Sequence, residues 1–207
     1  MARCNSEATG TKSDVLPFLR AWLSNPLRVS AIAPSSPALA ELITKEITAV
    51  SAPVIELGAG TGVFTRALLK RGLAESDLTI VEIGPDFVSM LRSRFPQARI
   101  FPVDAARLPQ YGLFEGSPVG AVVSGLPLLS MSPRKVMAIL AGAFFYIRPG
   151  GAFYQFTYGP RCPVPRPILD RLGLKAVRIG RAMKNVPPAA VYRITRRSPP
   201  PGLYPHA

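Results

Sequence analysis

The chain has little of the side chains on which much enzyme chemistry depends. It contains one histidine, His206, which is the penultimate of 207 residues, and two cysteines, Cys4 and Cys162. A single histidine in a Pro-rich tail argues against general-base catalysis by imidazole. Two cysteines so far apart provide neither a disulfide framework nor a zinc site. We therefore expect a cytoplasmic protein without a metal centre.

Long apolar runs are also missing. The N-terminal sequence MARCNSEATGTKSD lacks the apolar core of a signal peptide. The longest uncharged run, Gly116 to Pro133, contains three prolines and three glycines, a composition typical of a buried strand followed by a loop. We expect no membrane-spanning segment.

Acidic residues are scarce in the second half of the chain. Residues 1–116 carry 12 Lys/Arg against 11 Asp/Glu, a net charge of +1, whereas residues 117–207 carry 13 against the single Asp170, a net of +12. This asymmetry indicates an anionic partner, either nucleic acid or an acidic membrane surface. A soluble protein with a merely high isoelectric point is the alternative.

From residue 37 onward, apolar runs alternate with amphipathic stretches. Strands are expected at 54–57, 78–83, 99–103, 119–124, 152–159, 175–183 and 189–195, and helices at 37–48, 61–71, from 85, and from 133. This alternation predicts an α/β fold with a mostly parallel seven-stranded sheet and helices on both faces. The short link NVPPA makes the last two strands an antiparallel hairpin. We expect residues 1–36 to form an N-terminal segment that associates with a membrane or covers the site, residues 37–197 to form the domain, and residues 198–207 to form a disordered Pro-rich tail.

Three glycines in five positions follow the first expected strand. The stretch VIELGAGTG begins at Val54, and its glycines fall where that strand should end and a helix begin. The dinucleotide-binding pattern G-x-G-x-x-G would need a glycine at position 63, where this chain has Val63. The acidic Glu56, just before the loop, suits a positively charged part of a ligand better than a pyrophosphate.

The pattern E-x-G-x-G-x-G resembles motif I of the S-adenosylmethionine-dependent methyltransferases. Glu82, at the end of the second strand, is similar to the acidic residue that holds the ribose hydroxyls in that class, and Asp104 to the one that contacts the adenine amine. The resemblance implies a Rossmann-like class I methyltransferase with S-adenosyl-L-methionine as cofactor. The residues expected to bind it are Glu56, Gly58, Ala59, Gly60, Thr61, Gly62, Glu82, Ile83, Asp104, Ala105 and Ser124.

Four other segments indicate which class of molecule accepts the methyl group. FLRAWLSNPLRVSAIAPSSPALA, SGLPLLSMSP, FYQFTYGP and NVPPAAVYRI are similar to segments of bacterial phospholipid N-methyltransferases, and the resemblance covers about Val15 to Arg196. It implies stepwise methylation of phosphatidylethanolamine toward phosphatidylcholine. The ribosomal RNA adenine dimethyltransferases carry Asn-Leu-Pro-aromatic after strand four, whereas this chain has SGLPL, without an aromatic face for a flipped base. An RNA substrate is therefore the weaker alternative, and another amine, such as ornithine lipid or a soluble metabolite, is a further one.

Without a usable histidine, hydroxyls and carbonyls are the expected partners of the acceptor amine. We expect Tyr158 and the backbone carbonyls of Ser124 and Leu126 to form the catalytic site. Tyr154 and Tyr158 project to one face of the fifth strand, where aromatic rings would attract a growing cation. For Tyr154, packing in the core is an equally good interpretation.

Basic and amphipathic residues are expected to hold the lipid. Arg161 and Arg166, in the Pro-rich loop after strand five, would bind its phosphate, unless they are solvated surface. Residues 13–25, SDVLPFLRAWLSN, have an apolar face at helical spacing that includes Trp22, which would contact lipid. This predicted helix and the basic half should attach the protein to the anionic inner face of the cytoplasmic membrane. An ordinary helix packed over the cofactor is the other interpretation of residues 13–25.

Overall fold

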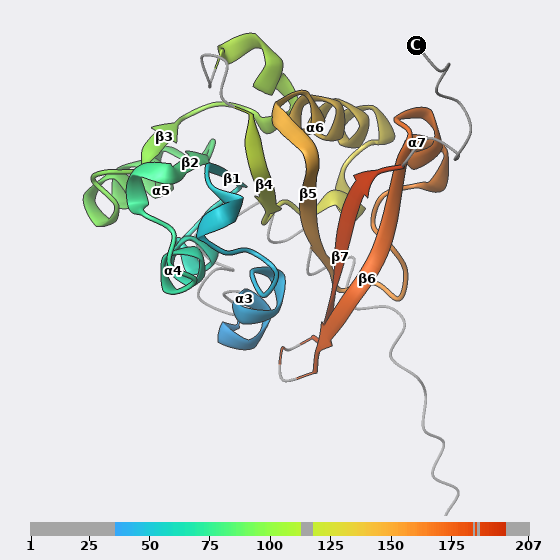
Figure 1. The fold of residues 1–207 in the computed structure, drawn as a ribbon, viewed down its shortest axis with the longest axis horizontal. Helices are drawn as coiled ribbons and strands as arrows, with labels where there is room; N and C mark the ends of the chain where they lie inside the picture. Colours follow the sequence, from blue (N-terminus) through green and yellow to red (C-terminus); the bar gives the residue numbers. More distant parts are fainter. Residues whose placement is uncertain (1–35, 113–117, 184, 186, 198–207) are drawn as a thin grey trace, which may run out of the picture.

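A single twisted sheet organises the chain (Figure 1). The computed structural model describes residues 36–112, 118–183, 185 and 187–197. The strand order is β3-β2-β1-β4-β5-β7-β6. Strands β1 to β5 run parallel, and β7 runs antiparallel to both β5 and β6. The strands are β1 (Val54–Leu57), β2 (Leu78–Val81), β3 (Arg99–Phe101), β4 (Val119–Ser124), β5 (Ile147–Thr157), β6 (Leu174–Ala182) and β7 (Ala189–Arg196).

The prediction of a mostly parallel seven-stranded sheet with an antiparallel hairpin is confirmed. What the sequence pattern did not predict is that β7 lies between β5 and β6, so that β6 forms the edge of the sheet. The exposed side chains of β6 include Lys175, Arg178 and Arg181. Charged residues on an edge strand discourage pairing with another chain, which gives these three a structural reason besides any functional one.

Helices cover both faces of the sheet. The described α-helices are α3 (Pro37–Ile43), α4 (Val63–Lys70) and α5 (Pro85–Arg94) on one face, and α6 (Pro133–Tyr146) and α7 (Arg166–Arg171) on the other. Ser36 and Ser132 cap α3 and α6 by accepting hydrogen bonds from backbone N–H groups, and each is followed by proline at the first helical position. Short 3-10 turns connect these elements: η1 (Ala49–Ser51), η2 (Glu75–Asp77), η3 (Ala105–Tyr111) and η4 (Leu128–Ser130).

Two elements differ from the prediction. Helix α3 ends at Ile43 rather than near residue 48, and the Thr44 hydroxyl donates to the Ala40 carbonyl at 2.8 Å, a local bond that competes with continuing the helix. Helix α7 falls in the segment expected to be a Pro-rich loop, because Pro165 and Pro167 stand where a helix start tolerates proline.

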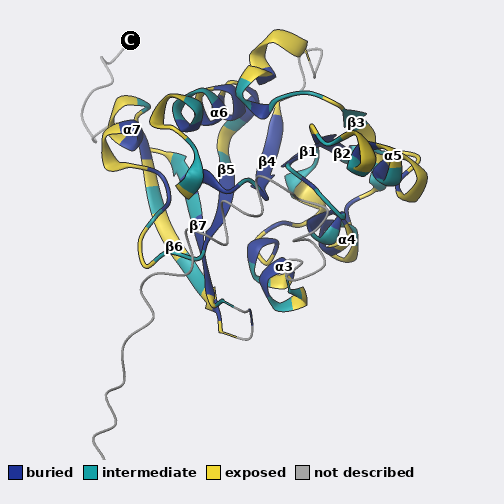
Figure 2. Ribbon diagram, turned by 180° about the vertical axis from the view of Figure 1, so that it is seen from behind, coloured by how far each residue is buried: buried dark blue, intermediate teal, exposed yellow. Residues whose placement is uncertain are grey.

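The core lies on both faces of β4 and β5, which are buried along most of their length (Figure 2). Every residue of β1, β2 and β4 is buried, which is typical of parallel strands covered on both sides. Helices α3 and α4 pack on one face, and η3, α6 and α7 on the other. The carboxyl ends of β1, β2 and β4 are therefore held rigidly.

The predicted amphipathic segment 13–25 and the Pro-rich tail 198–207 lie outside the described residues, so both stay predictions. Within the described part of the chain, no helix has the length and apolar character needed to cross a bilayer.

Candidate functional site

Two loops leave the sheet where its strand order reverses, between β1 and β4. In open α/β sheets this is the place where ligands bind. The glycine loop, residues 58–62, follows β1, and residues 125–128, here called the acceptor loop, follow β4. A Cβ added to Gly58 would lie 2.6 Å from Leu126 Cδ2, and one added to Gly125 would lie 2.4 Å from the Gly58 carbonyl oxygen. The two loops touch because both positions lack a side chain.

The glycine loop has a backbone that other residues rarely adopt. Gly58, Gly60 and Gly62 have φ values of 70°, 52° and 75°, in the left-handed region. A Cβ on Gly62 would lie 2.7 Å from the Phe95 ring, whereas one on Gly60 would meet none of the described residues within 4 Å. Gly58 and Gly62 are thus needed for close packing inside the protein, and Gly60 is where the loop opens outward.

Glu82 ties the glycine loop to the end of β2. Its Oε2 accepts a hydrogen bond from the Gly60 N–H, and its Oε1 accepts from the N–H groups of Ile83 and Gly84, all at 2.9 Å. A carboxylate has about four acceptor positions, so one stays open for a ligand hydroxyl. The neighbouring Ile83, which is among the residues expected to bind the cofactor, is 66% exposed.

Glu56 is a buried carboxylate with one unpartnered oxygen. It is 1% exposed, its Oε2 accepts from the Thr65 hydroxyl at 2.6 Å, and its Oε1 has no hydrogen-bond partner among the described residues. Burial raises the pKa of Glu56 to about 7, because removal from water disfavours the charged form more than the Thr65 hydrogen bonds favour it. A cationic group at this strand end would satisfy both the free oxygen and the charge.

Asp104 caps the η3 turn after β3. Its Oδ1 accepts from the Ala106 N–H and its Oδ2 from Lys135 Nζ, each at 3.0 Å. Burial alone would raise the pKa of Asp104, but the Ala106 hydrogen bond and the Lys135 ammonium outweigh it and hold the pKa below its usual value. Lys135, on α6, is a member of this site that the sequence pattern did not reveal. The next residue, Ala105, is buried.

The acceptor loop is held in place by Ser124, which was predicted, and by Gln155, which the sequence analysis did not single out. Ser124, the last residue of β4, is fully buried, and its hydroxyl accepts from the Leu126 N–H at 3.3 Å. The Leu126 carbonyl, predicted as a partner of the substrate amine, accepts from the Leu128 N–H at 3.0 Å and from Gln155 Nε2 at 2.9 Å. Both of its lone pairs are therefore engaged inside the protein. The signal in the sequence that could have revealed this contact is the polar Gln155 within the otherwise apolar end of β5.

The aromatic residues of β5 have different environments. Tyr154 is 5% exposed and donates to Glu46 Oε2 at 3.3 Å, and Glu46 also pairs with Arg193 at 3.2 Å. Burial, together with the Glu46 charge and hydrogen bond, raises the pKa of Tyr154 to about 12. Phe156 packs edge-on against Tyr158, with ring centroids 5.3 Å apart. These contacts place Tyr154 in the core below α3, whereas Tyr158 is only half-buried.

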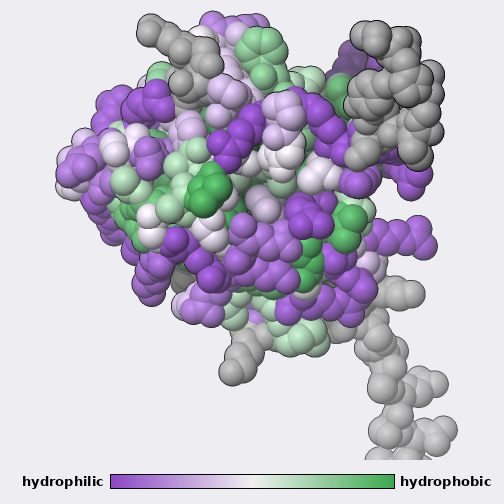
Figure 3. Space-filling model, viewed as in Figure 1, coloured by the Kyte–Doolittle hydropathy of each residue, from purple (hydrophilic) through white to green (hydrophobic). Residues whose placement is uncertain are grey.

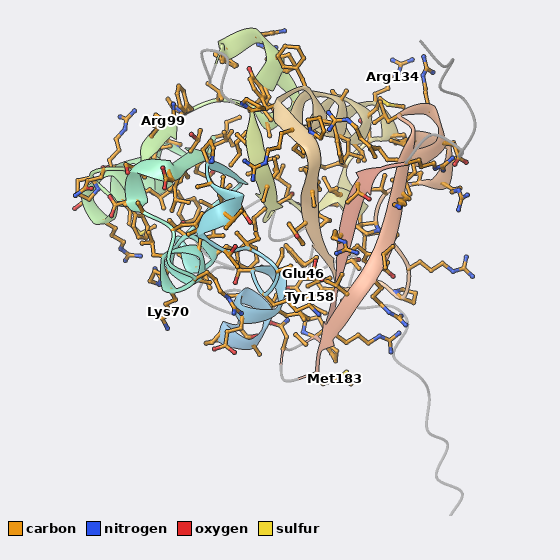
Figure 4. The ribbon with its side chains drawn as sticks, in the orientation of Figure 1. Glu46, Lys70, Arg99, Arg134, Tyr158 and Met183 are labelled. Carbon is orange, nitrogen blue, oxygen red and sulfur yellow. The ribbon has the colours of Figure 1, made fainter. Side chains whose placement is uncertain are left out.

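Tyr158 lies beside a junction of three chain segments, below the end of β5 (Figure 4). Its pKa is raised by burial, and a hydrogen bond with the Asn185 side chain opposes this shift. Asn185 is itself 3% exposed, accepts from the Ser36 N–H at 3.1 Å and donates to the Pro187 carbonyl at 2.7 Å. Asn185 thus joins the start of α3, the β6–β7 connection and Tyr158, a role that its position in NVPPA did not predict.

A small, open depression of about 10 Å³ adjoins Tyr158 and the acceptor loop. Apolar residues dominate its lining, and Leu129 at its rim is 45% exposed. Arg161, in the loop beyond β5, is exposed, and Arg166 forms an ion pair with Asp170 at 3.0 Å on the surface of α7. The depression is lined by Pro127, Leu128, Leu129, Phe156, Thr157, Tyr158 and Pro163.

Sequence comparisons define the class of this protein. Residues 54–151 match the family described as "Methyltransferase domain". An ornithine lipid N-methyltransferase of Singulisphaera acidiphila is 32% identical over 152 residues, which cover 71% of this chain and 79% of that relative. A ribosomal RNA small subunit methyltransferase A of Porphyromonas gingivalis is 36% identical over 77 residues, but these cover 36% of this chain and 29% of that relative.

Solved structures show the same fold. A 1,6-didemethyltoxoflavin-N1-methyltransferase of Burkholderia thailandensis, bound to S-adenosylhomocysteine, has a TM-score of 0.61 at 16% identity and covers 95% of both chains. A TehB-like S-adenosylmethionine-dependent methyltransferase of Corynebacterium glutamicum has a TM-score of 0.58 at 15% identity, with 87% of this chain and 97% of that chain covered.

The chain therefore belongs to the class I S-adenosylmethionine-dependent methyltransferases, and its cofactor is S-adenosylmethionine. The residues on β1 and β2 fit this group. The glycine loop opens at Gly60, and Glu56 Oε1, which is buried and has no partner among the described residues, lies at the same strand end, where a cation such as an amino group would pair with it. The predictions of fold and cofactor are confirmed, while the roles of individual site residues stay predictions.

Proposed function

We propose that this protein methylates the amine of a membrane-lipid headgroup. The observation that carries the proposal is the acceptor loop. Its sequence is Gly-Leu-Pro-Leu, without the asparagine and aromatic residue that would hold a flipped base, and it borders the apolar depression beside Tyr158. Such surroundings suit a substrate with an apolar body and a small polar end.

Two lipids share the required chemistry. The relative of 32% identity is named for ornithine lipid, and the sequence segments around the site resemble those of phosphatidylethanolamine methyltransferases. Both lipids present a primary amine on a headgroup that also carries an anionic group. The relatives named for ribosomal RNA match about a third of this chain, which makes RNA the weaker candidate.

Methyl transfer requires the protein to position the acceptor amine in its neutral form. When bound, S-adenosylmethionine supplies a methyl group on a cationic sulfur, and the amine nitrogen forms the new bond as the sulfur–carbon bond breaks. An amine with a lysine-like pKa of about 10.4 is neutral in roughly one molecule in 2,500 at pH 7, so a desolvated, apolar site that lowers the pKa of the amine raises the rate.

Tyr158 is proposed to orient this amine rather than to deprotonate it. Because burial raises the pKa of its hydroxyl above the usual value, Tyr158 stays protonated at neutral pH. Its oxygen can still accept a hydrogen bond from the amine, and its ring can attract the methylated cation. The proton released on methylation would leave through water.

The basic second half is proposed to attach the protein to an anionic bilayer. Lys175, Arg178 and Arg181 are exposed along β6, together with Val177 and, near the β6–β7 connection, Met183 (Figure 4). The face drawn in Figure 3 is mostly hydrophilic where β6 and β7 lie, with isolated apolar patches. Each basic residue near an anionic surface contributes about 1 kcal/mol of attraction. Arg161 and Trp22 remain candidates for direct contact with the lipid.

The function is tested with labelled S-adenosylmethionine and vesicles of phosphatidylglycerol mixed with ornithine lipid or with phosphatidylethanolamine. The wild type should label at least one amine lipid, and Tyr158→Phe should lower kcat by about tenfold or more. Tyr111→Phe, at an exposed tyrosine on η3, is the matched control and should keep the wild-type rate. No labelled lipid from either vesicle would refute the proposal.

Membrane attachment is tested separately by vesicle flotation. The wild type should float with anionic vesicles, and replacement of Lys175, Arg178 and Arg181 by glutamine, or deletion of residues 1–25, should weaken flotation while S-adenosylhomocysteine binding is retained. Unchanged flotation after both changes would show that neither surface attaches the protein.

A further inference from the structure

Gln155 is the most polar side chain in the buried middle of the sheet that the proposed chemistry does not use. It is fully buried on β5, where its backbone pairs with Ser124 on one side and Tyr192 on the other. Its Nε2 donates to the carbonyl oxygens of Leu126, at 2.9 Å, and Phe156, at 2.8 Å. One amide group thus connects the acceptor loop to β5, the strand that ends one residue before Tyr158.

The orientation of this amide follows from its partners. A rotation that exchanged Oε1 and Nε2 would place an oxygen against two carbonyl oxygens, so Nε2 must face them. The Oε1 atom is then left buried, with no hydrogen-bond partner in the part of the chain that the structure describes. An unsatisfied buried carbonyl costs about 1–3 kcal/mol, and a leucine or methionine would fill this space without that cost. Packing alone therefore does not explain a glutamine at this position.

The hydrogen bond to the Leu126 carbonyl explains why a glutamine stands at position 155. This oxygen accepts from both Gln155 Nε2 and the Leu128 N–H, so the turn of the acceptor loop is held at its centre. The Leu126 side chain in turn packs on Gly58, where a Cβ would come within 2.6 Å. A chain of direct contacts therefore runs from β5 through the acceptor loop to the loop that binds the methyl donor.

We propose that Gln155 is a positioning residue for methyl transfer: its amide fixes the acceptor loop against the glycine loop and thereby sets the approach of amine to methyl group. This inference rests on the proposed function for its kinetic readout. Gln155 acts through Leu126 and does not itself contact the reacting atoms. A misplacement of about 1 Å can cost about a hundredfold in rate. Loss of the hydrogen bond between Gln155 and Leu126 should therefore lower kcat strongly and change the affinity for the cofactor much less.

The first test compares Gln155→Leu with Phe153→Leu. Phe153 lies on the same face of β5, two residues earlier, and its ring stacks on Phe144 of α6, so its variant measures the effect of a large-to-small core change in the same strand. With the vesicle assay, Gln155→Leu should lose about 10- to 100-fold in kcat, while S-adenosylhomocysteine affinity changes by less than about threefold. Phe153→Leu should lower the melting temperature and keep kcat. Equal kcat in the two variants would overturn the proposal.

A second variant gives a signature that a structural role would not produce. Gln155→Glu can donate one hydrogen bond to the two carbonyls only while its carboxyl is protonated. Its kcat relative to wild type should therefore be highest near pH 6 and fall as the pH rises to 8.5. A pH-independent ratio would contradict the assigned bonds.

Hydrogen exchange separates failure of this inference from failure of the proposed function. The Leu126 and Leu128 amides should exchange at least tenfold faster in Gln155→Leu than in Phe153→Leu, whatever the acceptor is. If the wild type labels no lipid but the two variants differ in amide exchange, the assignment of a lipid substrate fails and the role of Gln155 in holding the acceptor loop is supported. If the exchange rates are equal, Gln155 does not hold the loop and the inference fails, even where lipids are labelled.

Discussion

The buried Glu56 should make the stability of the cofactor-free protein depend on pH. Its folded pKa of about 7 lies above the usual value of 4.5, so the folded state binds more protons than the unfolded state between these pH values. Stability is therefore lost as the pH rises from 4.5 to 7 and stays constant above. The shift of about 2.5 units corresponds to about 3 kcal/mol.

Glu56→Gln isolates this contribution. The glutamine carbonyl can still accept from the Thr65 hydroxyl but cannot ionise, so any cost of the new amide group is the same at every pH. The stability of the variant relative to wild type should rise by about 3 kcal/mol between pH 4.5 and pH 8, measured by urea denaturation without cofactor. For a chain of this size, that is about 6–12 °C in melting temperature. A constant difference across this range would refute the reasoning.

The same group should link cofactor binding to pH. A cationic amino group beside the free Glu56 oxygen favours the ionised form, so binding releases a proton below pH 7. The affinity for S-adenosylhomocysteine should increase by up to about tenfold per unit between pH 5.5 and 7 in the wild type. In Glu56→Gln the affinity should be weaker and nearly flat over that range, as measured by calorimetry. A parallel rise in both proteins would mean that Glu56 is not the titrating group.

Three further substitutions test the packing and charge of the site. Gly125→Ala places a methyl group 2.4 Å from a carbonyl of the glycine loop, so it should destabilise the protein by about 1–3 kcal/mol and weaken S-adenosylhomocysteine binding; unchanged binding would mean that the loops need not touch. Tyr154→Phe removes the hydrogen bond to Glu46 and should lower the free energy of unfolding by about 1 kcal/mol in urea denaturation, with the rate of lipid methylation unchanged. A lower methylation rate in the folded variant would instead place Tyr154 at the substrate. Lys135→Met removes the ammonium beside Asp104, so S-adenosylhomocysteine should bind a few-fold more weakly and stability should change by less than about 1 kcal/mol; unaltered binding would make this ion pair merely structural.

The fold was largely predictable because its signals are local. The strands at 54–57 and 119–124 appear as predicted, since β1 and β4 are short, wholly buried and bounded by turn residues. The position of β7 between β5 and β6 depends on long-range pairing, which no local pattern carries. Helix α7 was missed because prolines indicate a loop unless they stand at a helix start.

The cofactor side of the site was more predictable than the acceptor side. The glycines and acidic residues stand at fixed distances along the chain, directly at strand ends, so spacing alone brings them together. By contrast, Lys135, Gln155 and Asn185 reach the site from α6, the C-terminal part of β5 and the β6–β7 connection, and each is defined by contacts between segments far apart in the chain. The Leu126 carbonyl was expected to face the substrate, but whether it is already engaged could be learned only from the Gln155 contact.

The most direct test of the central claim offers three acceptors to the wild-type protein in parallel: ornithine lipid vesicles, phosphatidylethanolamine vesicles and small-subunit ribosomal RNA, each with labelled S-adenosylmethionine. The predicted result is label on the headgroup amine of at least one lipid and none on RNA. Label on RNA alone, with S-adenosylhomocysteine binding intact, would leave the fold and cofactor assignments standing and contradict the assignment of a lipid amine as the methyl acceptor.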